Sequence, residues 1–278
     1  MLNFIGMLFH NPLGLKSEGA QELYPRTERL KEFRNLESSG SNLSTSNSIV
    51  VIPTYNECDN IANLIKKLQS LKESPDILIV DDDSPDGTSD IVRKLIQKNE
   101  GIYLLQRTGK RGLGSAYRDG FKFALRHGWE YICQMDADFS HDPQDVSRLL
   151  SCCVQGADVV IGSRYVKGGK IKGWPPKRWL LSRAANLYAQ IITRSSIDDL
   201  TGGFKCFRRE ALEKIDLERV TSEGYVFQVE MNYWARKESL KIKQIPICFS
   251  DRQRGASKMG SQEAKEGFKQ LLKLVLWH

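Results

Sequence analysis

Two aspartates one residue apart are the side chains in this sequence best suited to chemistry. Asp136 and Asp138 follow the apolar run 131–133 in the stretch EYICQMDADFSHDP. In an extended chain alternate side chains point to the same side, so the two carboxylates face one way while Ala137 faces the other. Two like charges that close together require a counter-charge.

More carboxylates follow two other predicted strands. Glu57 comes after the run SIVVIP, and the stretch DDDSPDGT after DILIV brings four aspartates, Asp81, Asp82, Asp83 and Asp86. Because the available ligands are oxygens, with no histidine or cysteine cluster, a bound metal should be hard, Mg²⁺ or Mn²⁺. Such ions bind through one or two carboxylates together with substrate phosphates. The acids therefore predict a divalent ion that holds a diphosphate.

Helix capping is the alternative role for these acids. Asp142 precedes a proline, which suits an N-cap followed by proline in the first turn, and Asp90 fits the same role. A cap uses one carboxylate oxygen and does not require an Asp-x-Asp pair. We therefore assign capping to Asp142 and Asp90, and metal binding to Asp136 and Asp138. We interpret His141, in the same loop, as a hydrogen-bonding spacer and not as a ligand.

Basic residues come later in the chain. The stretch GSRYVKGGKIKGWPPKRWLLSR carries seven of them and DRQRGASK carries three. Arginine side chains bind phosphate oxygens in a bidentate manner. Arg164 follows a predicted buried strand, so we expect it to be functional. Lysines 167, 170 and 172 are also consistent with a solvated basic face, and Trp174 with a packing anchor for its loop.

Composition limits the possible functions without choosing among them. The chain has 278 residues, 40% hydrophobic and 27% charged, which is typical of a soluble globular protein. Its net charge of +7 favours an anionic partner: nucleic acid, an anionic membrane face or a phosphorylated substrate. The six cysteines form no CxxC pair, which indicates reduced structural thiols. No stretch reaches the roughly 20 apolar residues that a membrane-spanning helix needs.

Apolar strands alternate with amphipathic helices from residue 48 onward. The runs SIVVIP, DILIV, IYLLQ, EYICQM and DVVIGS read as strands, and helical spacing follows each of the first three. This order predicts an α/β fold with a mostly parallel, doubly wound sheet. Ligands bind beyond the carboxyl ends of such strands, where the acids lie.

We divide the chain into three segments. Residues 1–47 form a leader and a Ser/Asn/Gly-rich linker, disordered or lying at an interface. Residues 48–260 form the catalytic domain. Residues 261–278 form a basic amphipathic helix, for which membrane binding and ordinary core packing are equally consistent interpretations.

Eight motifs together resemble one family. They are VIPTYNE, VDDDSPDGT, GKRGLGSAYRDGF, MDADFSHDP, IGSRYVKGG, TGGFKCFRREAL, GYVFQVEM and RQRGASKM. In this order they resemble the polyprenol-phosphate (dolichol-phosphate) mannosyltransferases, family 2 glycosyltransferases with the Rossmann-like GT-A fold. The resemblance implies inverting transfer of mannose from GDP-mannose to a polyprenyl monophosphate, with Mg²⁺ or Mn²⁺ as cofactor.

The resemblance also implies a donor site. Its residues follow three strands and include the C-terminal basic motif: Pro53, Tyr55, Glu57, Asp82, Asp136, Ala137, Asp138, Arg252 and Lys258. Among them, Asp136 and Asp138 match the metal ligands, and Arg252 and Lys258 match the clamp on the donor diphosphate. Ser140 departs from the pattern, because some members have a glutamine there.

An acceptor site is implied on the other side. Arg164, Arg178 and Ser182 match positions around the acceptor phosphate, and we expect Gln228 and Glu230 to close this side. We assign catalysis to Asp136, Asp138 and Arg164. No general base is needed, because a phosphate monoester is already anionic near neutral pH.

The lipid acceptor implies a membrane. We expect a cytoplasmic protein, peripheral on the cytoplasmic face of a membrane, attached by its tail or by a small membrane-anchoring subunit. We expect no nucleic-acid partner, since the aromatic residues do not interleave with the basic ones. The alternative functions are a polyprenyl-phosphate glucosyltransferase or another family 2 transferase that uses a UDP-sugar. A phospho-receiver module, suggested by ILIVDDDS alone, needs about half this length.

Overall fold

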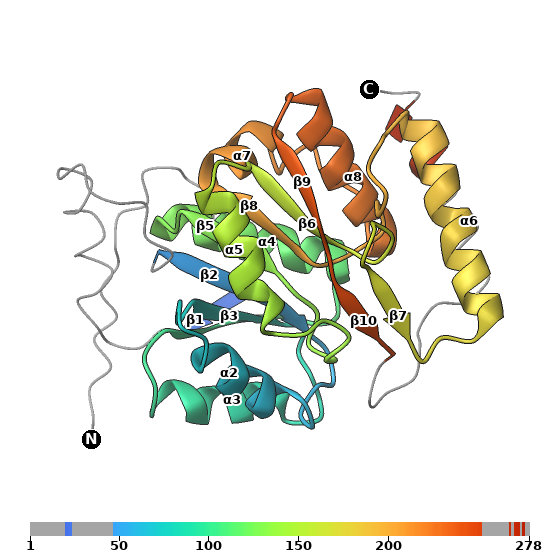
Figure 1. Ribbon diagram of the computed structural model, residues 1–278. Coiled ribbons are helices and arrows are strands. Elements are labelled where there is room, and N and C mark those ends of the chain that lie inside the picture. The colour runs from blue at the N-terminus through green and yellow to red at the C-terminus, as the bar shows by residue number, and fades with distance from the viewer. Residues whose placement is uncertain (1–19, 24–46, 252–266, 268–269, 273, 276–278) are drawn as a thin grey trace, which may run out of the picture.

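The computed structural model describes residues 20–23, 47–251, 267, 270–272 and 274–275, and its centre is an eight-stranded sheet (Figure 1). In spatial order the strands are β1 (Ala20–Leu23), β4 (Ile102–Arg107), β3 (Asp76–Asp81), β2 (Ser48–Thr54), β5 (Tyr131–Gln134), β8 (Lys205–Arg208), β6 (Val159–Ser163) and β9 (Ile242–Pro246). A separate two-stranded parallel sheet joins β7 (Lys170–Lys172) to β10 (Cys248–Ser250).

The sheet is mostly parallel, as the sequence predicts. Strands β4, β3, β2 and β5 run parallel as successive neighbours, and β6 runs parallel to β9. Two strands are antiparallel: β1 beside β4, and β8 between β5 and β6. Strand β1 lies within the segment predicted as a leader.

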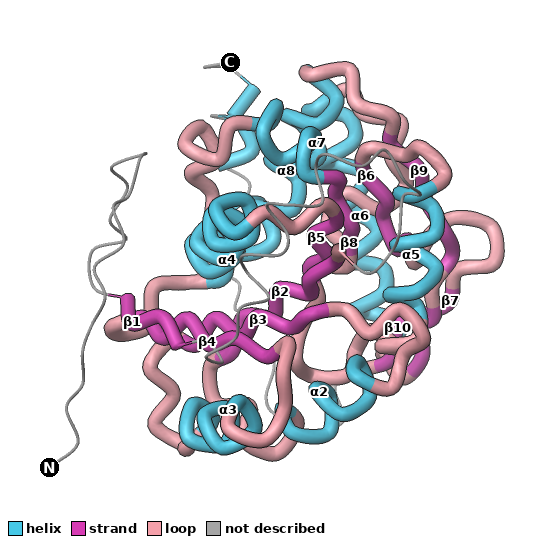
Figure 2. Tube along the Cα trace, turned by 90° about the vertical axis from the view of Figure 1, so that its left-hand side faces the viewer, coloured by secondary structure: helices cyan, strands magenta, loops and turns pink. Residues whose placement is uncertain are grey.

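Helices cover both faces of the sheet, and Figure 2 shows the two layers along its edge. The helices are α2 (Ile61–Gln69), α3 (Thr88–Ile96), α4 (Leu113–His127), α5 (Asp145–Val154), α6 (Pro176–Thr193), α7 (Arg209–Ile215) and α8 (Gly224–Lys237). One apolar cluster packs α4, α7 and α8 on one face, and a second packs α2, α3 and α5 on the other. The parallel strands are buried on both faces, which explains their continuous apolar sequences.

Close packing of α4 on the sheet depends on a glycine. A Cβ at Gly120 would lie 2.4 Å from Cγ1 of Val51 and 3.1 Å from Cγ2 of Val80, so any side chain would push the helix away from β2 and β3. This contact fixes the start of α4 near the carboxyl ends of the strands.

The described part of the tail packs inward. Leu271 and Leu274 are buried in the cluster that contains α8, while Leu272 is exposed. A Cβ at Gly267 would overlap the hydroxyl of Tyr225, so Gly267 lies directly against α8. Leu271 and Leu274 therefore pack in the core. Among the described helices, none has the length and apolar character to cross a membrane.

Candidate active site

The Asp-x-Asp loop follows β5 at the carboxyl edge of the sheet. Asp138 is buried, Asp136 is half-buried, and Ala137 between them is buried. The hydroxyl of Tyr117 donates a hydrogen bond to Oδ1 of Asp136 at 3.1 Å. The backbone N–H of Ser140 donates to Oδ1 of Asp138 at 3.0 Å. In each carboxylate, Oδ1 therefore has a fixed donor.

Tyr117 acts as a fixed donor beneath the loop. Its side chain lies on α4, is fully buried, and stacks on Phe227 of α8 with ring centroids 5.6 Å apart. Burial, together with the negative charge of Asp136, raises the pKa of Tyr117 well above its usual value. The hydroxyl stays protonated and keeps donating to Asp136.

The donor set at this loop suits a hard divalent ion. Within the described residues, no group of three or more histidine, cysteine, aspartate or glutamate side chains has the arrangement to hold a metal. Two carboxylates whose remaining coordination comes from water and substrate phosphates are how Mg²⁺ is commonly bound. Asp136 and Asp138 fit an ion that binds together with a diphosphate.

His141 is not suited to bind that ion. It is buried and stacks on Phe204, with ring centroids 4.8 Å apart. Burial lowers the pKa of His141 to about 4, although the charge of Asp138 opposes the shift. The ring is therefore neutral near pH 7 and packs as an aromatic side chain.

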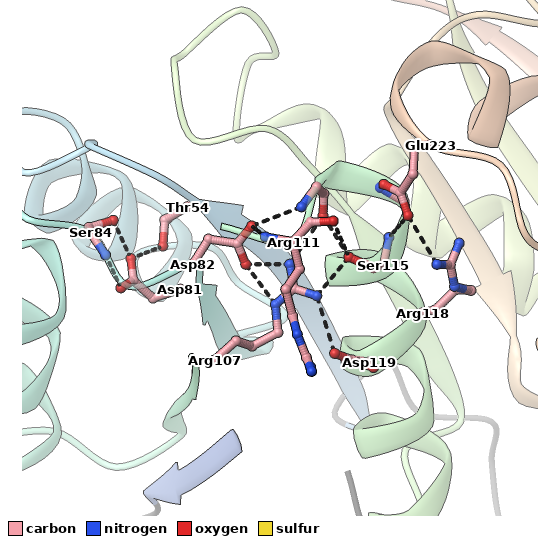
Figure 3. Close-up of polar contacts among 12 residues, drawn as sticks. Thr54, Asp81, Asp82, Ser84, Arg107, Arg111, Ser115, Arg118, Asp119 and Glu223 are labelled. Carbon is pink, nitrogen blue, oxygen red and sulfur yellow. Dashed lines mark hydrogen bonds and ion pairs between the residues drawn. The ribbon is translucent and has the colours of Figure 1, made fainter. Parts of the chain in front are cut away.

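Acids at the end of β3 and in the loop after it make contacts within the fold, and Figure 3 shows Asp81 with Thr54 and Ser84. Asp81 accepts hydrogen bonds from the hydroxyls of Thr54 at 2.8 Å, Ser84 at 2.6 Å and Ser89 at 2.6 Å. Asp86 accepts from the N–H and hydroxyl of Thr88, and this capping lowers its pKa despite partial burial. Asp81 and Asp86 thus have hydroxyl and backbone N–H partners within the fold.

Asp82 is paired with a buried arginine. Arg107 is 1% exposed, and its Nε donates to Oδ1 of Asp82 at 2.6 Å. The other carboxylate oxygen accepts from the backbone N–H groups of Arg111 and Gly112 at 3.0 and 3.2 Å (Figure 3). Asp82, a predicted nucleotide contact, thus fixes the loop that leads into α4.

Predicted donor residues gather beside that loop. The ammonium of Lys110 lies 4.6 Å from the ring centroid of Tyr55. Glu57 accepts a hydrogen bond from Nδ2 of Asn60 at 2.9 Å, and Pro53 lies within β2, next to β3. The loops after β2 and β3 thus form one side of the site. Arg252 and Lys258 lie outside the described residues.

A buried ion pair lies on the opposite side of the site. Arg164 directly follows β6, and Asp199 accepts hydrogen bonds from its backbone N–H at 2.9 Å, its Nε at 2.8 Å and its Nη2 at 2.7 Å. Burial would lower the pKa of Arg164, but the charge and hydrogen bonds of Asp199 raise it above the ordinary value. Burial would raise the pKa of Asp199, but Arg164 lowers it. Both groups stay charged.

Aromatic rings join Arg164 to the other predicted acceptor residues. The guanidinium of Arg164 lies 5.6 Å from the ring centroid of Trp174, and that of Arg178 lies 4.5 Å from the same ring. Ser182 shares a 2.8 Å hydrogen bond with the hydroxyl of Tyr165. The structure therefore brings Arg164, Arg178 and Ser182 into one cluster, with Trp174 as a packing anchor.

Glu230 has a structural contact. It is buried, and its Oε2 accepts hydrogen bonds from the backbone N–H groups of Thr221 and Ser222 at 3.1 and 2.8 Å. Next along this loop, Glu223 accepts from the N–H groups of Gly114 and Ser115 at the start of α4, at 2.8 and 2.9 Å (Figure 3). The loop before α8 is thereby fixed to α4.

Sequence reasoning missed three residues of the site: Tyr117, Arg107 and Asp199. Asp199 had a signal, because a buried arginine requires a nearby carboxylate and SIDDLTGGF supplies one. Tyr117 had none, because it reads as an ordinary residue of its helix.

Comparisons with known proteins agree with this geometry. Residues 49–216 match the family described as Glycosyl transferase family 2. The polyprenol monophosphomannose synthase of Mycolicibacterium smegmatis is 40% identical over 234 residues, covering 84% of this chain and 87% of that protein. The undecaprenyl-phosphate mannosyltransferase of Micrococcus luteus is 40% identical over 211 residues, covering 76% and 86%.

Solved structures of the glucosyl-3-phosphoglycerate synthase of Mycobacterium tuberculosis share the fold. Its complex with Mn²⁺, UDP-glucose and phosphoglyceric acid has a TM-score of 0.59 at 17% identity, covering 83% of this chain and 78% of that chain. Its complex with Mg²⁺ and UDP has a TM-score of 0.59 at 16% identity, covering 92% and 85%. The likeness confirms the predicted GT-A fold class.

Proposed function

Because this chain belongs to glycosyl transferase family 2, we propose that it transfers mannose from GDP-mannose to a polyprenyl monophosphate, giving a β-linked polyprenyl-phosphate mannose. One observation carries the proposal: the segment 199–203 borders both groups, because Asp199 and Thr201 accept hydrogen bonds from Arg164 while a Cβ at Gly203 would lie 3.5 Å from Oδ2 of Asp136. A transferase that moves a sugar from a nucleoside diphosphate to a phosphate acceptor needs both an oxygen-only acidic loop and a nearby arginine.

The donor half of the mechanism rests on Asp136 and Asp138. They would hold Mg²⁺ or Mn²⁺, and the ion would neutralise the charge that develops on the departing diphosphate. Tyr117 keeps Asp136 oriented, which favours a single arrangement of the ligands. Tyr55 and Glu57 would line the base, and Arg252 and Lys258 would clamp the diphosphate.

The acceptor half rests on Arg164 and Arg178. Asp199 holds Arg164 charged and oriented, while Arg178 makes a partly exposed 2.7 Å ion pair with Asp251 that an incoming phosphate can displace. The two guanidinium groups would lessen the repulsion between the phosphorylated substrates and align the acceptor oxygen with the anomeric carbon. No side chain has to remove a proton.

Helix α6 offers the surface that would meet the lipid. Its outer face carries Leu180, Leu187 and Ile191, exposed by 65%, 56% and 65% and spaced at i, i+7 and i+11. Exposed Lys177 and Arg183 flank this stripe. A basic helix with an exposed apolar stripe suits an anionic membrane surface, and the same helix carries Arg178 and Ser182. We therefore assign peripheral attachment, on the cytoplasmic face, to α6.

The donor and acceptor are tested by offering labelled sugar nucleotides in parallel. The purified protein is incubated with polyprenyl phosphate, Mn²⁺ and labelled GDP-mannose, UDP-glucose or UDP-mannose, and the organic-extractable label is counted. The proposal expects label from GDP-mannose alone. Label from a UDP-sugar alone would identify the alternative, a polyprenyl-phosphate transferase with another donor.

Membrane attachment is tested separately by vesicle flotation. The wild-type protein should float with vesicles containing anionic lipid, and the double variant Leu180→Asp/Leu187→Asp should lose most of that binding. Leu272→Asp, a change at an exposed leucine of the tail, serves as the matched control and should float like the wild type. Equal flotation of all three proteins would rule out α6.

A further inference from the structure

Three buried polar side chains lie beneath the Asp-x-Asp loop without a role in the mechanism above. Gln134 ends β5, Lys205 begins β8 and Gln228 lies on α8, and their exposed fractions are 0%, 0% and 2%. The ammonium of Lys205 donates to Oε1 of Gln228 at 2.6 Å and to its backbone carbonyl at 3.2 Å. Nε2 of Gln134 donates to the same Oε1 at 2.6 Å.

These contacts fix the orientation of the Gln228 amide. Nε2 of Gln134 also donates to the backbone carbonyl of Gly203 at 2.9 Å, so the Gln134 amide cannot rotate without losing that bond. Rotating the Gln228 amide by 180° would therefore set its NH₂ group against the N–H of Gln134. The Nε2 of Gln228 must therefore point away from Lys205.

That Nε2 is a buried donor with no hydrogen-bond partner among the described residues. An unsatisfied buried donor is unfavourable, so its position calls for an acceptor. One carboxylate oxygen lies near it. A Cβ placed at Gly203 would be 3.5 Å from Nε2 of Gln228 and 3.5 Å from Oδ2 of Asp136, so both atoms border the same space.

We propose that Gln228 is a positioning residue for Asp136: its fixed Nε2–H donates to one bridging water held over Gly203, and that water donates to Oδ2 of Asp136. Tyr117 holds Oδ1 of the same carboxylate, so Asp136 is restrained from α4 on one side and from α8 on the other. The inference rests on the proposed function, because the purpose of this restraint is to orient a metal ligand. It places Gln228 behind the donor ion and not on the acceptor side.

Gly203→Ala is the most direct probe. The added methyl group would make ordinary van der Waals contacts and fill the space between the two atoms, so the fold should be unaffected. Gln228→Met removes the donor at similar volume. Gln134→Met is the matched control, because it deletes an equally buried amide of the same network whose two N–H groups are already donated to Gln228 and to the carbonyl of Gly203.

The readout is Mn²⁺ affinity in the presence of saturating GDP, measured from the paramagnetic resonance signal of free Mn²⁺. Outer partners of metal ligands typically change affinity by about 10–100-fold. We expect Gly203→Ala and Gln228→Met to weaken Mn²⁺ binding at least about tenfold, and Gln134→Met to stay within about twofold. Thermal unfolding of each variant reports whether the fold is kept.

Unchanged Mn²⁺ affinity in Gly203→Ala would overturn the inference, and so would an equal loss in Gln134→Met. Failure of the proposed function looks different. Wild-type protein that binds Mn²⁺ with UDP but not with GDP would remove the donor assignment, while the ranking of the variants with UDP would still decide the role of Gln228. Wild-type protein that binds Mn²⁺ with neither nucleotide would remove both.

Discussion

The buried ion pair of Arg164 and Asp199 allows the acceptor side of the site to be tested with a single isosteric substitution. Asp199→Asn keeps the size of the side chain but removes its charge. Asp199 is 0% exposed and accepts three hydrogen bonds from Arg164, whereas an asparagine retains only one acceptor oxygen. The arginine would be left with a buried charge that is only partly satisfied.

The cost follows from these contacts. Breaking a buried ion pair by removing one partner costs about 3–5 kcal/mol, and a retained neutral hydrogen bond recovers about 1 kcal/mol. We therefore expect Asp199→Asn to lower the free energy of unfolding by roughly 2–4 kcal/mol. For a domain of this size, each kcal/mol lowers Tm by about 2–4 °C, so the expected drop is roughly 5–15 °C.

Function should change on one side of the site only. With Arg164 no longer oriented, we expect KM for polyprenyl phosphate to rise at least about tenfold, while affinity for Mn²⁺ and GDP is unchanged. Asp198→Asn is the matched control, because the carboxylate of this exposed neighbour accepts a hydrogen bond from the side chain of Gln244 and not from a buried arginine. Its stability should stay within about 0.5 kcal/mol of wild type.

Two results would contradict the roles given to Arg164 and Asp199. Equal Tm values for Asp199→Asn and Asp198→Asn would show that the pair is not a stabilising buried contact. A destabilised but folded Asp199→Asn with wild-type KM for the lipid would show that Arg164 does not bind the acceptor. Arg164→Met/Asp199→Leu, which removes both charges, should recover much of the lost stability.

Three further predictions concern other buried groups. His141 has a pKa of about 4 in the folded protein and about 6.5 in the unfolded chain, so the free energy of unfolding should fall by up to roughly 3 kcal/mol as the pH drops from 6.5 to 4. The urea midpoint of the wild type should therefore decrease over this pH range, whereas that of His141→Gln should lack this decrease. The same pH dependence in both proteins would contradict the low pKa of His141. Arg107→Met should lower the free energy of unfolding by about 3–5 kcal/mol, because it leaves Asp82 buried without its counter-ion; a urea midpoint equal to wild type would refute this. Tyr117→Phe should weaken Mn²⁺ binding with GDP about tenfold at unchanged Tm, and an unchanged Mn²⁺ affinity would show that its hydroxyl does not orient Asp136.

Much of the fold was predictable because its signals are local. The parallel strands are continuous apolar runs, and the helices repeat apolar residues at helical spacing, so each element is visible in its own segment. Strand β8 was not predicted, since four residues inserted antiparallel between β5 and β6 leave no local pattern. The sheet partners of a short strand depend on the rest of the chain.

The site also contains residues with a local sequence signal and residues without one. Asp136, Asp138 and Arg164 could be predicted as candidates because each follows a strand, and position in the sheet implies position at its carboxyl edge. The contacts of Asp81, Asp82 and Asp86 were not predicted, since the sequence does not show which acid meets a hydroxyl, an arginine or a helix N-terminus. Lys205 and Gln228 come from different elements and meet only in the folded chain.

Metal-dependent mannose transfer at Asp136 and Asp138 can be tested by measuring the transfer rates of Asp138→Asn and the wild type, each with and without EDTA. Labelled GDP-mannose and polyprenyl phosphate are supplied, and the organic-extractable product is counted. We expect wild-type transfer to stop with EDTA and resume with excess Mn²⁺, and Asp138→Asn, with Tm near wild type, to lose at least about 100-fold. Undiminished transfer by Asp138→Asn, or by the wild type in EDTA, would show that transfer does not depend on a metal ion bound at these aspartates.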